Sequence, residues 1–544
     1  MKSRSAEFGR SPFNDAHYII LSKNLQKSFA THNFPISAKS TYMIQDYKGQ
    51  KPSVNIDDNI ALIKGLFGDS QDFVGREFRP GGAGAPRLYM AYFDAMTNRE
   101  AMDFTVIRRL FDMDWASLPT HLPSIYETMR DRGIATTDIS ESDDMFDILY
   151  FIHAGDTPVF IDGCDKCVIV ATRGFPNRGV QSTELEVVVQ GSREAFSEVM
   201  RFNTALIRRR IRDNNLIVKQ SKLGSRSLTD IAVVYMKDIA RPEVVAEVER
   251  RLEAIDIDGV SDSGCVEQFI EESWLSPFPQ VQLTERPDKA ASSLLEGRVA
   301  IIVDNSPFVI IVPVTMNSFF QASEDYYSRW QVMSITRFLR FVGAFTAIAL
   351  PGLYMAIALF HPSMIPLLMV SRLAEASQAV PFPAVLEFLL LDAAFELLRE
   401  AGIRLKSASG GTIGIVGGLI IGQAAVEAGL VSPIVVIIVA LTGICTFAIP
   451  SVSLVYGFRL VKYFVLALSA FFGFFGFTIA MLAVLAHLAG LRSFGFPYLM
   501  PFAASEMNKY EDLKDSLFRF PLFSLKKRPF FANQDQAARV RQDS

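Results

Sequence analysis

Hydrophobic and polar residues follow two different patterns along the chain. Up to about residue 330, short apolar segments alternate with polar ones at spacings typical of strands and amphipathic helices. Beyond that point long apolar segments dominate, and residues 341–360 contain no charge. Twenty such residues can cross about 30 Å of hydrocarbon at about 1.5 Å per residue. The pattern predicts a large water-soluble N-terminal region followed by a polytopic helical membrane domain.

The N-terminal region is predicted to contain two α/β subdomains, residues 55–174 and 175–330, after a flexible, mildly basic arm of residues 1–54. The first subdomain has predicted helices at 55–67 and 98–112, and predicted strands at 72–78, 87–93, 157–163 and 166–173. The second has predicted helices at 193–214 and 242–255, and predicted strands at 185–190, 228–236 and within 297–314. Strands and helices therefore alternate in both subdomains.

Two features of this region have a functional and a structural interpretation. Cys164 and Cys167 form a CDKC segment, which fits a turn between two strands better than a metal site, because a zinc site needs two further ligands. Arg208, Arg209, Arg210 and Arg212 lie close together on a predicted helix. They could bind an anion or line a subunit contact, but a solvated helix face is the default interpretation.

The membrane domain, residues 331–502, is predicted to have spans at about 341–360, 411–431, 433–456 and 463–489, with interfacial or re-entrant helices at 363–400 and a cytosolic tail at 503–544. Gly414, Gly418 and Gly422 recur at four-residue steps, which lets helices pack closely in lipid. Pro351 lies within the first span and frees a backbone carbonyl.

Several ordered segments resemble the GerA family, the A subunits of nutrient germinant receptors of spore-forming bacteria. They include SPFPQ, LLEGRVAIIVD, SPFVIIVPVT, LPGLYMA, FHPSMIP, VPFPAVLE, FELLREAGIRL, GIVGGLIIGQAAVEAGLVSP and LRSFGFPYLMP. The resemblance covers roughly residues 60 to 502, so the N-terminal arm and the C-terminal tail lie outside it.

The resemblance implies a non-enzymatic membrane protein of the spore inner membrane, with a cytosolic N-terminal part. It also implies a transporter-like B subunit and a C-subunit lipoprotein as partners, and self-association, most simply as a pentamer. In such a complex the A subunit resembles an oligomeric cation channel whose opening triggers germination. No motif for a cofactor or for nucleic-acid binding accompanies these segments.

Polar residues inside the membrane domain are the candidate pore or coupling residues. Gln423 and Glu427 lie four residues apart on one face of a predicted span, where an ionisable group is expected to face protein or water. A ring of Glu427 carboxylates could attract cations to a pore. Alternatively, Glu427 lies at a membrane edge, or pairs with Arg459 or Lys462. Glu387, Asp392 and Glu396 could line a cation vestibule, or belong to an amphipathic helix in the interface.

The number of spans is open from the sequence. Four spans return the C-terminus to the cytosol but place Arg404, Lys406, Arg459 and Lys462 outside, against the positive-inside trend. A fifth span at 381–400 corrects those loops but exports the tail, so the even count is preferred. A secondary transporter is the alternative function, although no inverted repeat is recognisable. A membrane-tethered enzyme is less favoured, because the soluble region shows no nucleophile–base pair.

Overall fold

The protein is described by a computed structural model. The residues that it describes are 44–82, 85–115, 126–128, 139–174, 190–366, 380–404, 422–503, 510–536 and 538–539, with single positions in some of the gaps. The predicted arm is shorter than expected, because residues 44–54 belong to the first subdomain. Tyr47, in a short 3-10 helix (η1, Ile44–Tyr47), is buried in its core. Residues 1–43 lie outside the described part.

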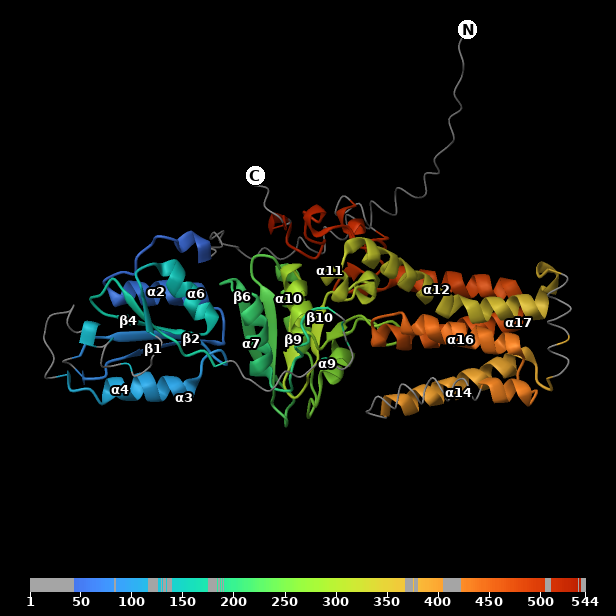
Figure 1. Ribbon diagram of the computed structural model, residues 1–544, viewed down its shortest axis with the longest axis horizontal. Coiled ribbons are helices and arrows are strands. Elements are labelled where there is room, and N and C mark those ends of the chain that lie inside the picture. Colours follow the sequence, from blue (N-terminus) through green and yellow to red (C-terminus); the bar gives the residue numbers. More distant parts are fainter. Residues whose placement is uncertain are drawn as a thin grey trace, which may run out of the picture. The chain divides into compact units, whose positions relative to one another are not determined.

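The first subdomain is a three-layer α/β structure around a five-stranded antiparallel sheet with the strand order β1-β2-β4-β5-β3. Helices α2 and α6 cover one face of the sheet, and α3 and α4, joined by a π-helical turn, cover the other (Figure 1). The elements are α2 (Ile56–Phe67), β1 (Phe73–Phe78), β2 (Leu88–Phe93), α3 (Arg99–Met102), η3 (Asp103–Ile107), α4 (Arg108–Phe111), β3 (Ile139–Ser142), α6 (Met145–Ala154), β4 (Thr157–Ile161) and β5 (Cys167–Val170).

The second subdomain is built in the same way, around an antiparallel sheet of order β6-β7-β9-β10-β8. Helices α7 and α10 cover one face, and α8 and α9 cover the other. The elements are α7 (Met200–Arg210), β6 (Leu216–Leu223), β7 (Thr229–Met236), α8 (Pro242–Glu253), α9 (Ser263–Ile270), β8 (Gln282–Thr284), α10 (Pro287–Leu295), β9 (Val299–Val303) and β10 (Val309–Val312).

The two subdomains are therefore structural repeats. Adding five to each strand number of the first sheet gives the strand order of the second. The helices also correspond, since α2 and α7 precede the first strand while α6 and α10 precede the fourth. This duplication was not recognised in the sequence, because the two repeats share apolar patterns rather than identical residues.

Side-chain hydrogen bonds that fix the first helix occur in both repeats. Asn59 accepts from the Ser53 N–H (2.9 Å) and donates to the Ser53 carbonyl (2.7 Å). Asn203 makes the same two bonds to Ser197, at 2.8 and 2.6 Å. Each asparagine is the fourth residue of its helix, so it closes the preceding loop onto the helix start. The repeats thus share their local stabilisation as well as their topology.

The turn between the last two strands also matches. An aspartate at its start, Asp162 or Asp304, accepts the N–H of the first residue of α2 (3.4 Å) or α7 (2.9 Å). The next residue, Gly163 or Asn305, has a positive φ of 88° or 67°. The CDKC segment occupies this turn in the first repeat, which confirms its interpretation as a turn. Burial raises the pKa of both Cys164 and Cys167, so neither thiol is activated.

The predicted helix at 193–214 is wrong at both ends, since α7 spans only Met200–Arg210. Upstream of α7, the Phe196 N–H donates to the carbonyl of Glu285 (2.8 Å), the residue that follows β8. This hydrogen bond holds the chain before α7 in a non-helical conformation against the second sheet. In the predicted strand at 185–190, positions 186, 188 and 190 are described and do not belong to a strand, and the other three lie outside the described residues.

Three of the four clustered arginines do not form a solvated face, and only Arg212 of the four is exposed. Arg208 is 2% exposed and donates to Asp72 and to Ser70 Oγ (2.6 Å) in the first repeat, with its guanidinium 3.9 Å from the centre of the Phe93 ring. Arg209 and Arg210 pair with Glu194. Arg208 thus joins the two repeats, and sequence periodicity could not show this because its partners lie about 136 residues away.

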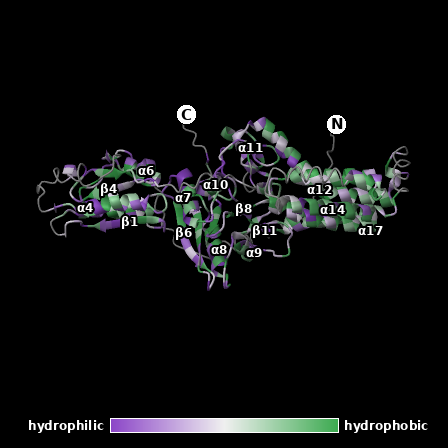
Figure 2. Ribbon diagram, turned by 60° about the horizontal axis from the view of Figure 1, so that its bottom comes forward, coloured by the Kyte–Doolittle hydropathy of each residue, from purple (hydrophilic) through white to green (hydrophobic). Residues whose placement is uncertain are grey.

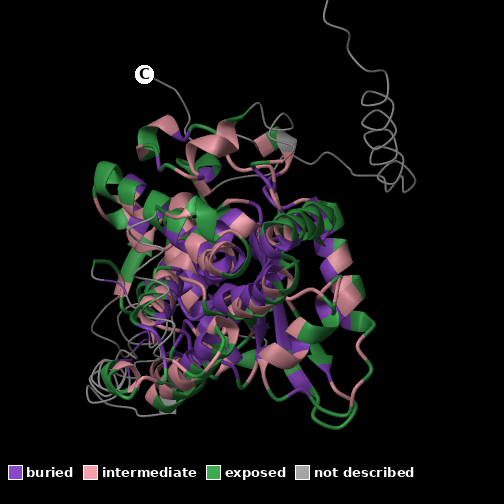
Figure 3. Ribbon diagram, turned by 90° about the vertical axis from the view of Figure 1, so that its right-hand side faces the viewer, coloured by how far each residue is buried: buried purple, intermediate pink, exposed green. Residues whose placement is uncertain are grey.

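Beyond residue 330 the described residues include the helices α12 (Trp330–Phe360), α14 (Ala384–Arg404), α16 (Pro433–Phe447) and α17 (Val452–Gly490), and a helical stretch at 422–427. Among the described residues, α12 and α17 are long and apolar enough to cross a membrane. These helices are mostly hydrophobic in Figure 2, and much of their outer surface is exposed in Figure 3. Helix α12 is flanked by two short 3-10 helices, η6 (Met316–Phe320) and η7 (Pro362–Met364), and by one turn of α-helix, α11 (Glu324–Tyr327).

Helix α17 is a hairpin of two helical arms, residues 452–472 and 474–490. Gly473 has non-helical angles (φ 61°, ψ −141°). The Phe278 ring lies 6.0 Å from Phe458 in the first arm and 5.9 Å from His487 in the second. A straight helix would separate these two residues by about 43 Å, so the chain reverses at Gly473.

The predicted segments 433–456 and 463–489 therefore do not match single helices. The first is interrupted after Phe447, because Pro450 removes a backbone donor and Ser451 starts the next helix by accepting the Leu454 N–H. The second is divided by Gly473. The predicted interfacial segment at 363–400 overlaps the continuous helix α14, which is 21 residues long and extends to Arg404.

The C-terminal segment, which comprises the described residues from 491 to 539, packs on the second repeat. The Asn533 N–H donates to the Ile239 carbonyl (2.7 Å), and the Arg241 guanidinium donates to the Phe530 carbonyl (2.7 Å) while lying 4.3 Å from the centre of that residue's ring. Its short elements are β11 (Arg492–Ser493), β12 (Phe496–Pro497), η9 (Glu511–Lys514), η10 (Leu522–Ser524) and η11 (Gln534–Gln536). Residues 503–539 are thus part of the folded unit in their described portions.

Candidate functional site

The ionisable residues of the helical bundle meet where α14 packs against α16 and the first arm of α17. Asp392 accepts hydrogen bonds from Lys462 Nζ to its two oxygens (2.7 and 2.9 Å) and from the Tyr463 hydroxyl (2.6 Å). Asp392 and Lys462 are each 4% exposed. The pair is therefore shielded from water within a contact between apolar helices, where an unpaired charge would be expensive.

Two further acidic residues of α14, Glu396 and Glu387, also have partners. Glu396 pairs with Arg399 on its own helix and with Arg459 of α17 (3.3 Å). Glu387 is 2% exposed and accepts the backbone N–H of Ser432 (2.7 Å), the residue that precedes α16. These contacts fix the direction of α14, because its N-terminal end lies beside the start of α16. The two helices therefore run parallel.

A small cavity lies beside the Asp392–Lys462 pair. Its volume is about 20 Å³, and its lining includes Thr442, Thr446 and Ala347. A cavity of this size and polarity holds about one water molecule. Pro351 has no N–H to pair with the carbonyl of Ala347 four residues earlier, so this helical hydrogen bond is missing beside the cavity. Ala347, whose carbonyl Pro351 leaves without a helical partner, thus lines the same cavity as Asp392.

Glu427 differs from Glu387, Asp392 and Glu396. Its side chain is exposed and accepts only from the Gln423 amide (3.0 Å) among the described residues. It does not pair with Arg459 or Lys462, which bind Glu396 and Asp392 instead. Its helix ends at once, since Gly429 has a φ of 63°. Glu427 therefore lies at the end of the bundle that holds Ser432.

The glycine repeat is described only in part. Gly422 is buried, and a Cβ atom there would lie 3.5 Å from Val436 of α16, which indicates close helix packing at this position. Gly414 and Gly418 lie outside the described residues.

A second charged cluster at the base of α12 was missed in the sequence. Arg337 (0% exposed) donates to Asp325 (3.0 Å) and to Asp515 of the C-terminal segment (2.6 Å), and Arg340 donates to Asp325 (2.9 Å). The Tyr326 hydroxyl also donates to Asp515 (2.6 Å). The sequence places both arginines before an apolar span but does not show their partners. This cluster joins α12 to both α11 and the C-terminal segment.

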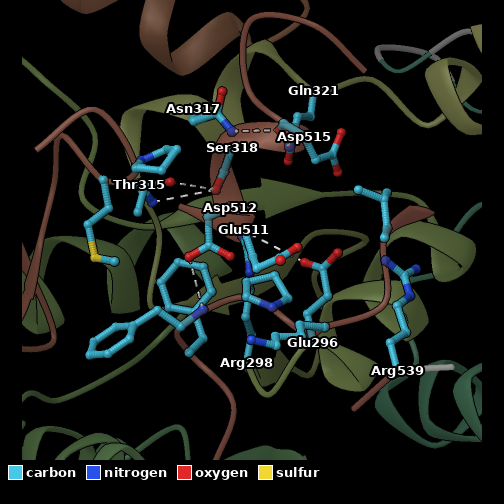
Figure 4. A pocket seen from close by; sticks show the side chains of 17 residues that line it. Glu296, Arg298, Thr315, Asn317, Ser318, Gln321, Glu511, Asp512, Asp515 and Arg539 are labelled. Carbon is cyan, nitrogen blue, oxygen red and sulfur yellow. Dashed lines mark hydrogen bonds and ion pairs between the residues drawn. The ribbon is translucent and has the colours of Figure 1, made fainter. Parts of the chain in front are cut away.

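A cavity of about 60 Å³ adjoins this cluster (Figure 4). Glu296 and Arg298 line it from the second repeat, whereas Asp512 and Asp515 come from the C-terminal segment. The Asn317 amide donates to the Asp515 carbonyl (3.1 Å) at its edge. The cavity follows the seam where the C-terminal segment covers the second repeat.

Known proteins resemble the chain over most of its length. The family model described as Bacillus/Clostridium GerA spore germination protein matches residues 61–531. Spore germination protein KA of Bacillus subtilis (strain 168) is 39% identical over 90% of this chain and 89% of its own length. The uncharacterized membrane protein YfkQ of the same strain is 35% identical over 89% of this chain and 93% of its own length.

A solved structure also matches. It is the N-terminal domain of the A subunit of the Bacillus megaterium spore germinant receptor GerK3, with 30% identity, a TM-score of 0.37, and coverage of 51% of this chain and 98% of that domain. The family match also extends past residue 502, the limit expected from the sequence, to residue 531. It therefore includes most of the C-terminal segment that packs on the second repeat.

Proposed function

Because the chain belongs to the GerA family of Bacillus and Clostridium spore germination proteins, we propose that it is the A subunit of a nutrient germinant receptor. In this proposal several copies, most simply five, surround a cation pore in the spore inner membrane. A transporter-like B subunit and a C-subunit lipoprotein complete the receptor. Opening of the pore releases cations and triggers germination, and the A subunit itself catalyses no reaction.

The bundle supports a membrane domain with an even number of crossings. Helix α12 runs from the side of the second repeat to Phe360, which lies against Gly473 at the opposite end of the bundle. Helices α14 and α16 both run back from that end. In this proposal the return crossing between them is the span predicted at 411–431, whose residues 411–421 lie outside the described part of the chain. The two arms of α17 add one crossing in each direction. Six crossings leave both termini in the cytosol.

This count resolves the conflict over basic residues. Arg404 and Lys406, at or after the end of α14, fall on the cytosolic side together with Arg492, as the positive-inside trend requires. Arg459 and Lys462 lie within a crossing helix and are neutralised there by Glu396 and Asp392. The four-span count had placed these two residues in an external loop.

The observation that carries the channel proposal is the exposed carboxylate of Glu427. Three other carboxylates of the bundle, Glu387, Asp392 and Glu396, are satisfied within the protomer, whereas Glu427 has only an amide partner among the described residues. Glu427 lies at the end of its helix, just before Gly429, which is the position of a pore mouth in this proposal. A ring of such carboxylates, one per subunit, concentrates cations there.

The test is the cation current of the assembled receptor in planar bilayers, with and without Glu427→Gln. We expect the single-channel cation conductance to fall several-fold and to depend less on ionic strength, because the ring of charge is lost. Glu253→Gln, which removes an exposed carboxylate at the end of α8, is the matched control and should leave the current unchanged. Equal conductance of wild type and Glu427→Gln in an assembled complex refutes the role of Glu427.

The secondary-transporter alternative is separated by the same recordings. A transporter moves its ion only with a coupled substrate, so its current disappears without a substrate gradient. A channel conducts down the ion gradient alone once it is open.

A further inference from the structure

The loop that joins α9 to β8, residues 271–281, presents two large apolar side chains to the outside of the sheet region. Trp274 is 82% exposed and Leu275 is 73% exposed. Phe269, near the end of α9, is 49% exposed. Single exposed apolar residues are common, but adjacent Trp and Leu side chains exposed to this degree form a patch that requires a partner.

The loop is held rigidly, so this exposure is built into the fold. Gln280 Oε1 accepts the backbone N–H groups of Glu272 (3.1 Å) and Ser273 (3.0 Å), and Gln280 Nε2 donates to the Ser273 carbonyl (2.8 Å). The Gln280 N–H donates to Glu271 Oε1 (2.9 Å). Gln280 is 1% exposed. The chain is thus closed into a tight turn with Trp274 and Leu275 at its outer side.

The same loop contacts the helical bundle close to the start and close to the end of α17. Ser276 Oγ lies 2.8 Å from His487 Nε2, one turn before α17 ends at Gly490. The Pro277 carbonyl lies so close to Gly457 that a Cβ atom there would be 2.3 Å from it. Phe278 packs against rings of both α17 arms. This accounts for the SPFPQ segment, residues 276–280, which connects the second repeat to the bundle.

We propose that Trp274 and Leu275 insert into the headgroup layer of the membrane on the cytosolic side. The inference rests on the proposed membrane crossing of the α17 arms, because that crossing places the level of His487 near the boundary of the hydrocarbon. The arm that carries His487 also exposes apolar residues, with Leu482 59% and Leu485 56% exposed. The loop that carries the patch is thus bonded through Ser276 to an arm with exposed apolar residues, and Trp is the residue most favoured at that depth.

The occupant is lipid rather than another protein surface because of this connection to the bundle. An inserted loop would hold the second repeat at a fixed height on the bilayer. The clamp to both α17 arms would then transmit any tilt of those arms to β8.

The test uses the full-length chain in vesicles containing lipids brominated either near the headgroup or deep in the acyl chain. The difference in emission between wild type and Trp274→Phe isolates Trp274 from Trp115 and Trp330. We expect the Trp274 emission to be blue-shifted, and to be lost more with shallow than with deep bromines. Trp274→Phe keeps an exposed aromatic residue, so it should not affect folding.

A second variant separates failure of this inference from failure of the membrane proposal. Leu482→Trp adds a reporter at the middle of the second α17 arm, and its emission should be lost more with deep bromines. If Leu482→Trp is quenched and Trp274 is not, the loop inference is refuted while the membrane crossing stands. If neither is quenched, the membrane crossing itself fails. Trp274 shielded from both lipid bromines and aqueous acrylamide would indicate a subunit contact and would also refute the inference.

Discussion

The two α/β repeats and the helical bundle distribute charge in opposite ways. Within each repeat, the contacts between helices and sheet are apolar, and the buried pair Arg208–Asp72 lies at the joint between the repeats. In the bundle, Asp392 and Lys462 lie inside a helix–helix contact, whereas large apolar side chains such as Phe471 (76% exposed) face outward. The repeats thus have the apolar interior typical of a water-soluble domain. The bundle has the paired internal charges and apolar outer surface typical of a membrane domain.

The largest effect is expected from breaking the charged contact in the bundle. Asp392→Ala leaves Lys462 buried without its carboxylate, and removal of one partner of a buried pair destabilises by about 3–5 kcal/mol. Thermal unfolding in detergent should therefore show a large loss of stability. The double change Asp392→Leu with Lys462→Met should recover most of it, because no unpaired charge remains. If both variants are equally unstable, the pair is not what holds α14 to α17.

Breaking the corresponding pair between the repeats should have a smaller effect. Arg208→Met leaves Asp72 with the Ser70 hydroxyl (2.8 Å) as a remaining donor, so we expect a loss of about 3 kcal/mol, at the lower end for buried pairs. Urea unfolding of a soluble fragment of residues 44–328 measures it. Arg212→Met is the matched control on the same arginine cluster; its exposed contact with Tyr150 should contribute less than about 1 kcal/mol. Equal effects of the two substitutions would contradict the buried joint.

The smallest effect concerns pH at the same joint. Burial lowers the pKa of His153 to about 3, even though Nε2 lies 2.7 Å from Asn214 Oδ1, a hydrogen bond that raises it. The unfolded chain binds this proton below about pH 6.5 and the folded chain does not. Stability should therefore fall by about 1.4 kcal/mol per pH unit below pH 6.5, which amounts to a loss of about 2 kcal/mol at the mildly acidic pH of about 5.

The pH effect is measured as a difference between wild type and His153→Gln in the same fragment, since carboxylates also titrate in this range. The variant should lose this part of the acid sensitivity. Parallel stability curves of the two proteins down to pH 4 would show that His153 is accessible to protons in the folded state.

Many elements of the repeat region could be predicted from the sequence, because their apolar residues follow regular periods, whereas β3, α6, β6, α9, β8 and α10 were not predicted. The cap of α2, Pro242 at the start of α8 and the β4–β5 hairpin are examples of the predicted features. The contacts between distant segments could not be predicted. Arg208 resembles a surface residue until Asp72 is placed beside it, and the partners of Arg337 come from the C-terminal segment.

In the bundle, the sequence identified the polar residues but not their arrangement. Glu387, Asp392 and Glu396 indicated an interfacial helix, since hydropathy weighs each charge without its partner. Arg459 and Lys462, which neutralise two of them, lie about 70 residues away. The reversal at Gly473 was also hidden, because the residues on both sides of it are equally apolar. The composition therefore indicated how much of the chain is apolar, but it could not indicate the number of membrane crossings.

The central claim is that the bundle reverses at Gly473, so that both arms of α17 cross the membrane and the C-terminal segment returns to the side of the repeats. Single cysteines at two exposed positions test it, in a variant lacking the four native cysteines. Phe475→Cys lies beside the turn, and Arg492→Cys follows the second arm. In sealed vesicles of known orientation, a membrane-impermeant maleimide should label the two cysteines from opposite sides, with Arg492→Cys on the cytosolic side. Labelling of both from one side would contradict the claim.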